Sequence, residues 1–184
     1  MGFLSKIFGQ KQKDKPNSDL AFYENVVDRI VVSDTLKSDL KAQLKQAFED
    51  PKSFYDEYNN YILAQRGLTY PKDALQTPKF VLIDTLQDNG EMAEVDWREE
   101  ESEIRIFLNE IRMAKNYDFI ISTDDLYEGY DTGKVIELID EKELKEQGYS
   151  IEILDIDSDC YVFTIVPLRD KHEVKAMFEE LKIK

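Results

Sequence analysis

The chain has 184 residues, and its 39 acidic and 24 basic side chains give a formal net charge of −15 at pH 7. This charge argues against nucleic acid as a partner, because phosphate groups would be repelled from such a surface. One cysteine and one histidine are too few for a disulfide framework or a zinc site, and 42% hydrophobic residues are too many for a disordered chain.

The first 17 residues predict a flexible tail that precedes the folded domain. Residues 1–8 place four apolar side chains on one helical face, and lysines follow them through residue 15. Such a segment can rest on an anionic membrane surface, but eight residues bury too little area for stable attachment. We therefore expect a basic, amphipathic tail over residues 1–17, with a peripheral membrane protein held by residues 1–8 as an alternative function.

Residues 18–90 predict a helical half. Apolar residues recur there at helical spacing, and serine, aspartate, proline and glycine residues stand at the expected ends. The third helix would carry a broad aromatic face at residues 54–62, whose spacing fits ordinary packing better than a binding surface. The four predicted helices run from Ser18 to about Val32, from Ser33 or Asp34 through Phe48, from Pro51 to Gly67, and from Thr77 to Gly90.

Residues 91–184 predict strands as well as helices. Residues 92–97 alternate between apolar and acidic side chains, as in a strand with one solvated face. Residues 161–166 are apolar on both faces and therefore predict a central strand. Residues 119–121 fit a short buried strand and a packed loop equally well. A further strand is predicted at residues 149–156, and helices are predicted from about Glu100, at residues 133–147, and from about Lys171.

These elements predict an α+β fold, with a helical N-terminal half followed by a small, mainly antiparallel sheet covered by helices. We expect residues 18–184 to form a single domain, with a helical part at 18–90 and a sheet-containing part at 91–184. No run of apolar residues in the sequence is long enough to span a membrane.

The sequence lacks the glycine-rich, serine and histidine motifs that mark the common nucleotide-binding, hydrolase and metalloprotease sites. His172 lies in a charged setting that is typical of an exposed residue. Cys160 precedes an apolar strand, where cysteine is usually a small core side chain. We therefore predict no catalytic residue and no cofactor-binding residue.

Asp155, Asp157 and Asp159 form a cluster that suggests a metal ion. Clustered carboxylates suit Mg²⁺ or Ca²⁺, but the glycine and glutamate that a calcium loop needs at its sixth and twelfth positions are absent. The cluster also fits a solvated turn, in which aspartate bonds its own backbone. If Asp96 lies at the end of an adjacent strand, these carboxylates would converge and serve as a cation site or in acid–base chemistry.

The acidic excess is concentrated in one half of the chain, since residues 84–166 hold 24 acidic and 7 basic side chains. Asp96-Trp97 closes the strand in this half, and we expect Asp96 to face outward and Trp97 to anchor the core. Four glutamates follow closely, so the stretch also predicts an acidic docking surface for a basic protein. The candidate interaction residues are Trp97, Glu99, Glu100, Glu101 and Glu103.

Residues 77–167 resemble an uncharacterised bacterial family known as a domain of unknown function. Three features carry the likeness: a helix with a glycine stop that leads into Asp96-Trp97, an acidic helix at residues 99–114, and Asp157-Ser158-Asp159-Cys160-Tyr161 before an apolar strand. Members of that family often have serine at the position of Cys160. The resemblance implies a bacterial cytosolic protein with an α+β fold, and it brings no activity.

The favoured hypothesis is a cytoplasmic, non-enzymatic protein-interaction module with an acidic docking surface. It would be regulatory, or similar in class to the small acidic immunity proteins that neutralise bacterial toxins. Its partner would be a protein with a basic patch, and no cofactor is expected. The alternative is a protein that binds Mg²⁺ or Ca²⁺, or a hydrolase, which uses the carboxylates of Asp96, Asp157 and Asp159.

Overall fold

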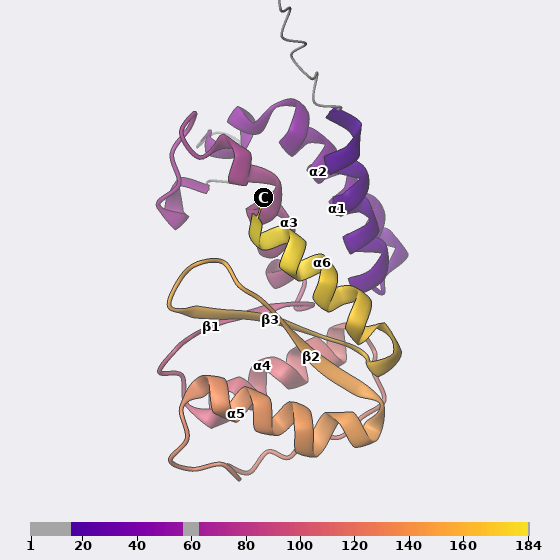
Figure 1. The fold of residues 1–184 in the computed structure, drawn as a ribbon, viewed down its shortest axis with the longest axis vertical. Coiled ribbons are helices and arrows are strands. Elements are labelled where there is room, and N and C mark those ends of the chain that lie inside the picture. Colours follow the sequence, from indigo (N-terminus) through magenta and orange to yellow (C-terminus); the bar gives the residue numbers. More distant parts are fainter. Residues whose placement is uncertain (1–15, 57–62, 184) are drawn as a thin grey trace, which may run out of the picture.

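Residues 16–56 and 63–183 are described by a computed structural model of the chain. The chain forms three layers, in which helices cover both faces of a three-stranded antiparallel sheet (Figure 1). The predicted α+β class, with its helical N-terminal half, is confirmed. Residues 1–15 of the predicted tail lie outside the described residues, as does the part of the aromatic face that contains Tyr58, Tyr61 and Ile62.

Within the described residues, four α-helices form the layer on one face of the sheet. Helix α1 begins at Pro16, two residues before the predicted cap, and α2 is capped by Ser33, whose hydroxyl accepts a hydrogen bond from the backbone N–H of Leu36 at 3.4 Å. The prediction of α3 from Thr77 is confirmed. The four helices are α1 (Pro16–Ile30), α2 (Asp34–Glu49), α3 (Thr77–Asp88) and α6 (Lys171–Ile183).

The helix predicted from Pro51 to Gly67 is wrong in its first turns. The chain forms a 3-10 turn at Pro51–Tyr55, and a second short 3-10 turn lies at Leu63–Arg66. The backbone of Asp50 leaves the helical conformation, with φ −140°, and Ser53 bonds back to its carbonyl through both its N–H and its hydroxyl, which closes a tight turn. Gly67 ends the segment in the left-handed region, with φ +78°, as a helix stop should.

The sheet has the strand order β1-β3-β2, with both neighbours antiparallel to β3. The prediction that the last strand is central is therefore confirmed. This strand is buried on both faces, because Val162 and Val166 point toward the helical layer while Phe163 and Ile165 point the other way. The strands are β1 (Ala93–Asp96), β2 (Tyr149–Leu154) and β3 (Cys160–Pro167).

The second face of the sheet is covered by α4 (Glu101–Ala114) and α5 (Thr132–Ile139). Helix α5 continues through a π-helical turn and a 3-10 turn to Gly148, which has φ +84°, so the predicted end of this helix is confirmed. Residues 119–121 are a packed loop and not a strand, in which Phe119 and Ile121 are buried and Ile120 is 81% exposed. Among the described residues, no helix is long and apolar enough to cross a membrane.

Lys115 lies between the two hydrophobic cores, immediately after α4, and is only 1% exposed. Its amine donates hydrogen bonds to the backbone carbonyl of Ile30 at 2.7 Å and to that of Ile165 at 3.1 Å. Burial lowers the pKa of Lys115 to about 8, although the nearby carboxylate of Glu91 opposes this shift. This lysine therefore joins α1, β3 and α4 by polar contacts within an apolar environment.

Candidate functional site

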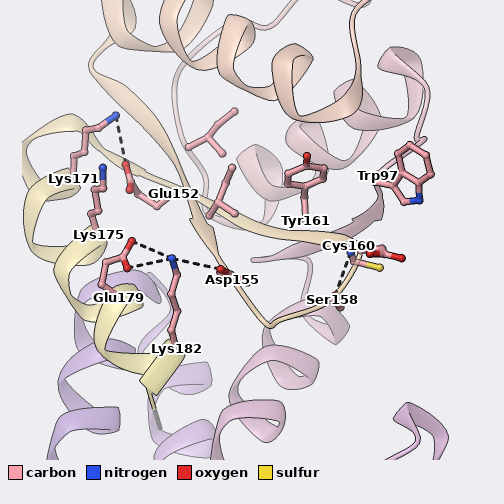
Figure 2. A pocket seen from close by; sticks show the side chains of 13 residues that line it. Trp97, Glu152, Asp155, Ser158, Cys160, Tyr161, Lys171, Lys175, Glu179 and Lys182 are labelled. Atoms are coloured by element: carbon pink, nitrogen blue, oxygen red, sulfur yellow. Dashed lines mark hydrogen bonds and ion pairs between the residues drawn. The ribbon is translucent and has the colours of Figure 1, made fainter.

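A pocket of about 760 Å³ opens beside the hairpin that joins β2 and β3 (Figure 2). Ile151, Ile153, Tyr161 and Trp97 also contribute to its lining. One face of α6 supplies positive charge. The charged lining consists of Lys171, Lys175 and Lys182 together with Glu152, Asp155, Asp159 and Glu179.

Ion pairs cross this pocket wall from α6 to β2 and the hairpin. Lys171 lies 3.6 Å from the carboxylate of Glu152, while Lys182 lies 3.5 Å from Asp155 and 3.1 Å from Glu179 (Figure 2). Lys175 stands between these pairs, and no carboxylate within the described ranges is close enough to form an ion pair with it. The wall therefore has mixed charge, with one cation left available to a ligand.

A polar cluster at the start of β2 lies behind this wall. The hydroxyl of Ser150 is 2.9 Å from the carboxylate of Asp140, and the amine of Lys171 donates to the same hydroxyl at 2.7 Å. Burial raises the pKa of Glu152, against the opposing effect of Lys171. A serine beside a lysine is typical of some hydrolases, but Ser150 is 0% exposed, so no substrate can reach it. The cluster instead fixes α6 to β2.

The predicted aspartates occupy the hairpin turn. The N–H of Asp157 donates to the carboxylate of Asp155 at 2.9 Å, and this hydrogen bond lowers the pKa of Asp155. Asp157 itself has φ +60°, a left-handed conformation that aspartate tolerates in turns. Asp96 pairs in register with Cys160 beside the turn, and its carboxylate accepts from the N–H of Arg98 at 2.9 Å. These contacts close turns of the backbone.

A metal site at these aspartates gains no support from the geometry. Nowhere in residues 16–56 and 63–183 do three or more histidine, cysteine, aspartate or glutamate side chains converge as metal ligands. Mg²⁺ and Ca²⁺ need several oxygen ligands around one point, so a pair of neighbouring carboxylates is not enough.

The expectation that Trp97 anchors the core is wrong. Its side chain is 46% exposed, and the guanidinium of Arg98 lies over the ring at 4.1 Å from its centre. The physical reason is that β1 ends at Asp96, where the N–H of Glu99 donates to the carbonyl of Asp96 at 3.0 Å and closes a turn. The inward and outward alternation of the strand therefore stops before the tryptophan.

Glu101 is not available as a docking residue, which corrects a second expectation. Its side chain is 6% exposed and accepts hydrogen bonds from Arg105 at 2.7 and 2.8 Å. It also accepts from the backbone N–H groups of Leu126 at 2.8 Å and Tyr127 at 2.7 Å. Burial alone would raise the pKa of Glu101, but these hydrogen bonds outweigh it and lower the pKa. Glu101 therefore holds the loop that follows residue 122.

Glu143 completes this buried network from the end of the α5 segment. Arg105 donates to its two carboxylate oxygens at 2.9 and 3.1 Å and to the backbone carbonyl of Ser122 at 3.0 Å. Glu143 also accepts from the N–H of Ser122 at 3.2 Å. One arginine and two carboxylates thus fix residues 122–127 against α4.

A second pocket, of about 450 Å³, lies over this fixed loop. Two exposed apolar side chains belong to the same loop, namely Leu126 at 55% and Tyr130 at 58%. Arg98 lines this pocket, and its contact with the Trp97 ring places Trp97 next to it. Glu103 is exposed in the first turn of α4. We define the acidic–aromatic surface as Trp97, Glu99, Glu100, Asp125, Leu126, Glu128 and Tyr130.

Sequence reasoning missed the loop members of this surface and the lysines of the first pocket. Residues 123–133 read as an acidic turn, and nothing in the sequence indicated that Glu101 holds them beside Glu99 and Glu100. The lysines at positions 171, 175 and 182 did carry a signal, because this spacing places them on one face of a helix.

The described residues form a three-layer α+β protein, and the two pockets described above open on its surface. Residues 29–184 match the family model described as Domain of unknown function (DUF6630), so the chain belongs to this family. The resemblance seen at residues 77–167 is thereby confirmed, and the match also includes most of the helical half. Comparisons with curated proteins and with solved structures found no match.

Proposed function

We propose that this protein is a non-enzymatic interaction module of the bacterial cytoplasm, which binds a basic partner protein through its acidic–aromatic surface. The observation that carries the proposal is the exposure of Leu126 and Tyr130 among carboxylates, in a loop that is otherwise firmly held. Exposing apolar side chains to water costs free energy, so exposed ones with a charged rim favour a protein interface.

Charge supports a basic partner. Residues 84–166 contain 24 acidic and only 7 basic side chains, and Glu100, Asp125 and Glu128 of the surface are exposed. A concentrated negative potential accelerates the encounter with a positive patch, and this acceleration weakens as salt screens the charges. Tyrosine and tryptophan supply the contact area that such an interface needs at its centre.

The loop of the surface is pre-organised, which also favours binding. Its backbone is fixed from the protein side by hydrogen bonds that Glu101, Arg105 and Glu143 form at least partly shielded from water. A loop that is already in its bound conformation loses little conformational entropy when the partner arrives.

The test starts with affinity capture from the native lysate, followed by purification of the partner and measurement of its affinity for two variants. One variant carries Glu100→Gln, Asp125→Asn and Glu128→Gln in the surface. The control carries Asp39→Asn, Glu49→Gln and Asp88→Asn, three exposed acids of α2 and α3 that change the net charge by the same amount.

We expect the surface variant to bind more slowly and at least about 10-fold more weakly, since each rim charge contributes to the association rate. The control should bind like the natural protein apart from the small effect of net charge. Equal affinity of the two variants, or binding that does not change between low and high salt, would refute the proposal.

A further inference from the structure

Along the edge strand β2, the backbone N–H and carbonyl groups of successive residues point alternately toward β3 and away from it. Two contacts fix which residues point their backbone groups away from β3. The carbonyl of Gly148 accepts from the N–H of Leu168 at 2.8 Å, so even-numbered residues face β3. The N–H of Ile151 instead donates to the carboxylate of Asp140 at 2.8 Å, on the side away from β3. By the two-residue period of a strand, both backbone groups of Ile153 also point outward. The N–H of Asp155 points outward too, because it shares a planar peptide with the carbonyl of Leu154, which faces β3 at the end of the strand.

The open part of this edge is symmetric about Ile153. Asp140 already occupies the N–H of Ile151, whose carbonyl has only a long 3.5 Å contact with the hydroxyl of Ser150. Among the described residues, no group outside the sheet bonds to the N–H or carbonyl of Ile153 or to the N–H of Asp155. The edge therefore offers two donors and two acceptors, centred on a side chain that is 41% exposed.

We propose that β2 pairs with β2 of a second copy of this chain, antiparallel and about a two-fold axis at Ile153. In this arrangement each Ile153 bonds to Ile153 of the partner subunit through both its N–H and its carbonyl. The N–H of Asp155 bonds to the carbonyl of Ile151 of the partner subunit, and the reciprocal bond completes four. The two donors and two acceptors around Ile153 are then satisfied, and the two sheets become one of six strands.

The pocket wall along this edge suits a second copy better than a foreign segment. A two-fold interface brings a surface against itself, so a wall of one charge sign would repel its own copy. This wall instead mixes three lysines with four carboxylates, and Lys175 is available to pair with a carboxylate of the partner subunit. The two exposed isoleucine side chains would meet on the opposite side of the sheet and exclude water there.

The association must be weak and must strengthen with salt. Four backbone hydrogen bonds and one isoleucine pair make a small interface, which is typical of micromolar or weaker dissociation constants. Each copy carries a net charge of −15, and salt screens the resulting repulsion. Binding of a basic partner to the acidic–aromatic surface would respond to salt in the opposite direction, so failure of either proposal is distinguishable from failure of the other.

Sedimentation equilibrium of the full chain tests the proposal across protein concentration at low salt and at about 1 M salt, where charges are screened beyond about 3 Å. The mass should rise from 21.6 kDa toward twice that value, and more so at high salt. Ile153→Pro removes the outward N–H and the isoleucine side chain but no hydrogen bond of the β2–β3 ladder. It should therefore raise the dissociation constant by at least about 30-fold, the factor expected for two lost hydrogen bonds alone.

Ile153→Thr should also weaken the dimer, whereas Ile106→Thr, at a similarly exposed isoleucine of α4, should not. If the proline variant does not fold, amide hydrogen exchange of the natural protein decides, because exchange at Ile153 and Asp155 should slow with increasing protein concentration. A mass of 21.6 kDa under all conditions, or exchange at these amides that is independent of concentration, would overturn the proposal.

Discussion

Replacement of Arg105 with methionine should destabilise the fold by about 3–5 kcal/mol, because it leaves the buried carboxylate of Glu101 and the partly buried one of Glu143 without their cation. The side chain of Arg105 is 2% exposed and makes five hydrogen bonds to Glu101, Glu143 and the carbonyl of Ser122. Methionine fills a similar volume, so the loss is electrostatic and not a cavity. For a chain of this length the melting temperature should fall by roughly 10–15 °C.

The pH dependence identifies the cause. The pKa of Glu101 is lowered in the folded state, so its interactions stabilise the protein above the unfolded pKa of about 4.3, and this contribution is lost as pH falls through the folded value. The difference in free energy of unfolding between the natural protein and Arg105→Met should therefore have its full size at pH 7 and shrink below about pH 4.

Urea denaturation followed by circular dichroism measures the free energy of unfolding for both proteins. Arg112→Met is the matched control, since Arg112 lies on the same helix but is only partly buried and makes a single 3.4 Å contact with Asn109. This control should cost less than about 1 kcal/mol. If Arg105→Met costs no more free energy of unfolding than the control, or if its cost does not shrink below about pH 4, the network does not hold the loop as described.

Three further outcomes are expected. Relative to Lys115→Met, the natural protein should gain up to about 3 kcal/mol of stability between pH 8 and pH 10, because the unfolded lysine still binds a proton while the buried one, with its pKa of about 8, has lost it; a flat difference across pH-dependent urea denaturation would contradict this. Gly133→Ala should cost about 1–3 kcal/mol, since the added Cβ would lie 2.5 Å from the hydroxyl of Tyr161, and thermal melts should show a smaller cost in a Tyr161→Phe background. Millimolar Mg²⁺, Ca²⁺ or Mn²⁺ should leave the melting temperature unchanged, and a clear upward shift would revive the cation site at Asp155, Asp157 and Asp159.

Local patterns were enough to predict most elements of the fold. The apolar run at residues 161–166 indicated a central strand because only a strand covered on both faces can bury every side chain. Helix ends at Ser33, Asn89-Gly90 and Gly148 were readable because capping is a local property of the backbone. The segment after Pro51 was misread, since a 3-10 turn and an α-helix start with the same residues.

The candidate site was much less predictable, because it depends on which distant residues meet. The four closely spaced glutamates after Trp97 appeared equivalent in the sequence. Glu101 is nevertheless buried by Arg105, one helical turn later, and by the loop at Leu126, 25 residues away. The exposure of Trp97 depends on where β1 ends, which an alternating pattern does not specify. Which part of the β2 edge stays open depends on Asp140, because its carboxylate occupies the N–H of Ile151. No local sequence pattern indicates this contact.

The eight residues of β3 are the shared support of both helical layers. Val162 and Val166 belong to one core, Phe163 and Ile165 to the other, and all four are 0% exposed. Neither layer can open without exposing the side chains of the strand on which the other layer rests, so we expect the amides of β3 to exchange only through global unfolding. A ligand bound to one helical layer should then slow amide hydrogen exchange in the other layer as well. This protection would need no change of conformation to pass between the layers.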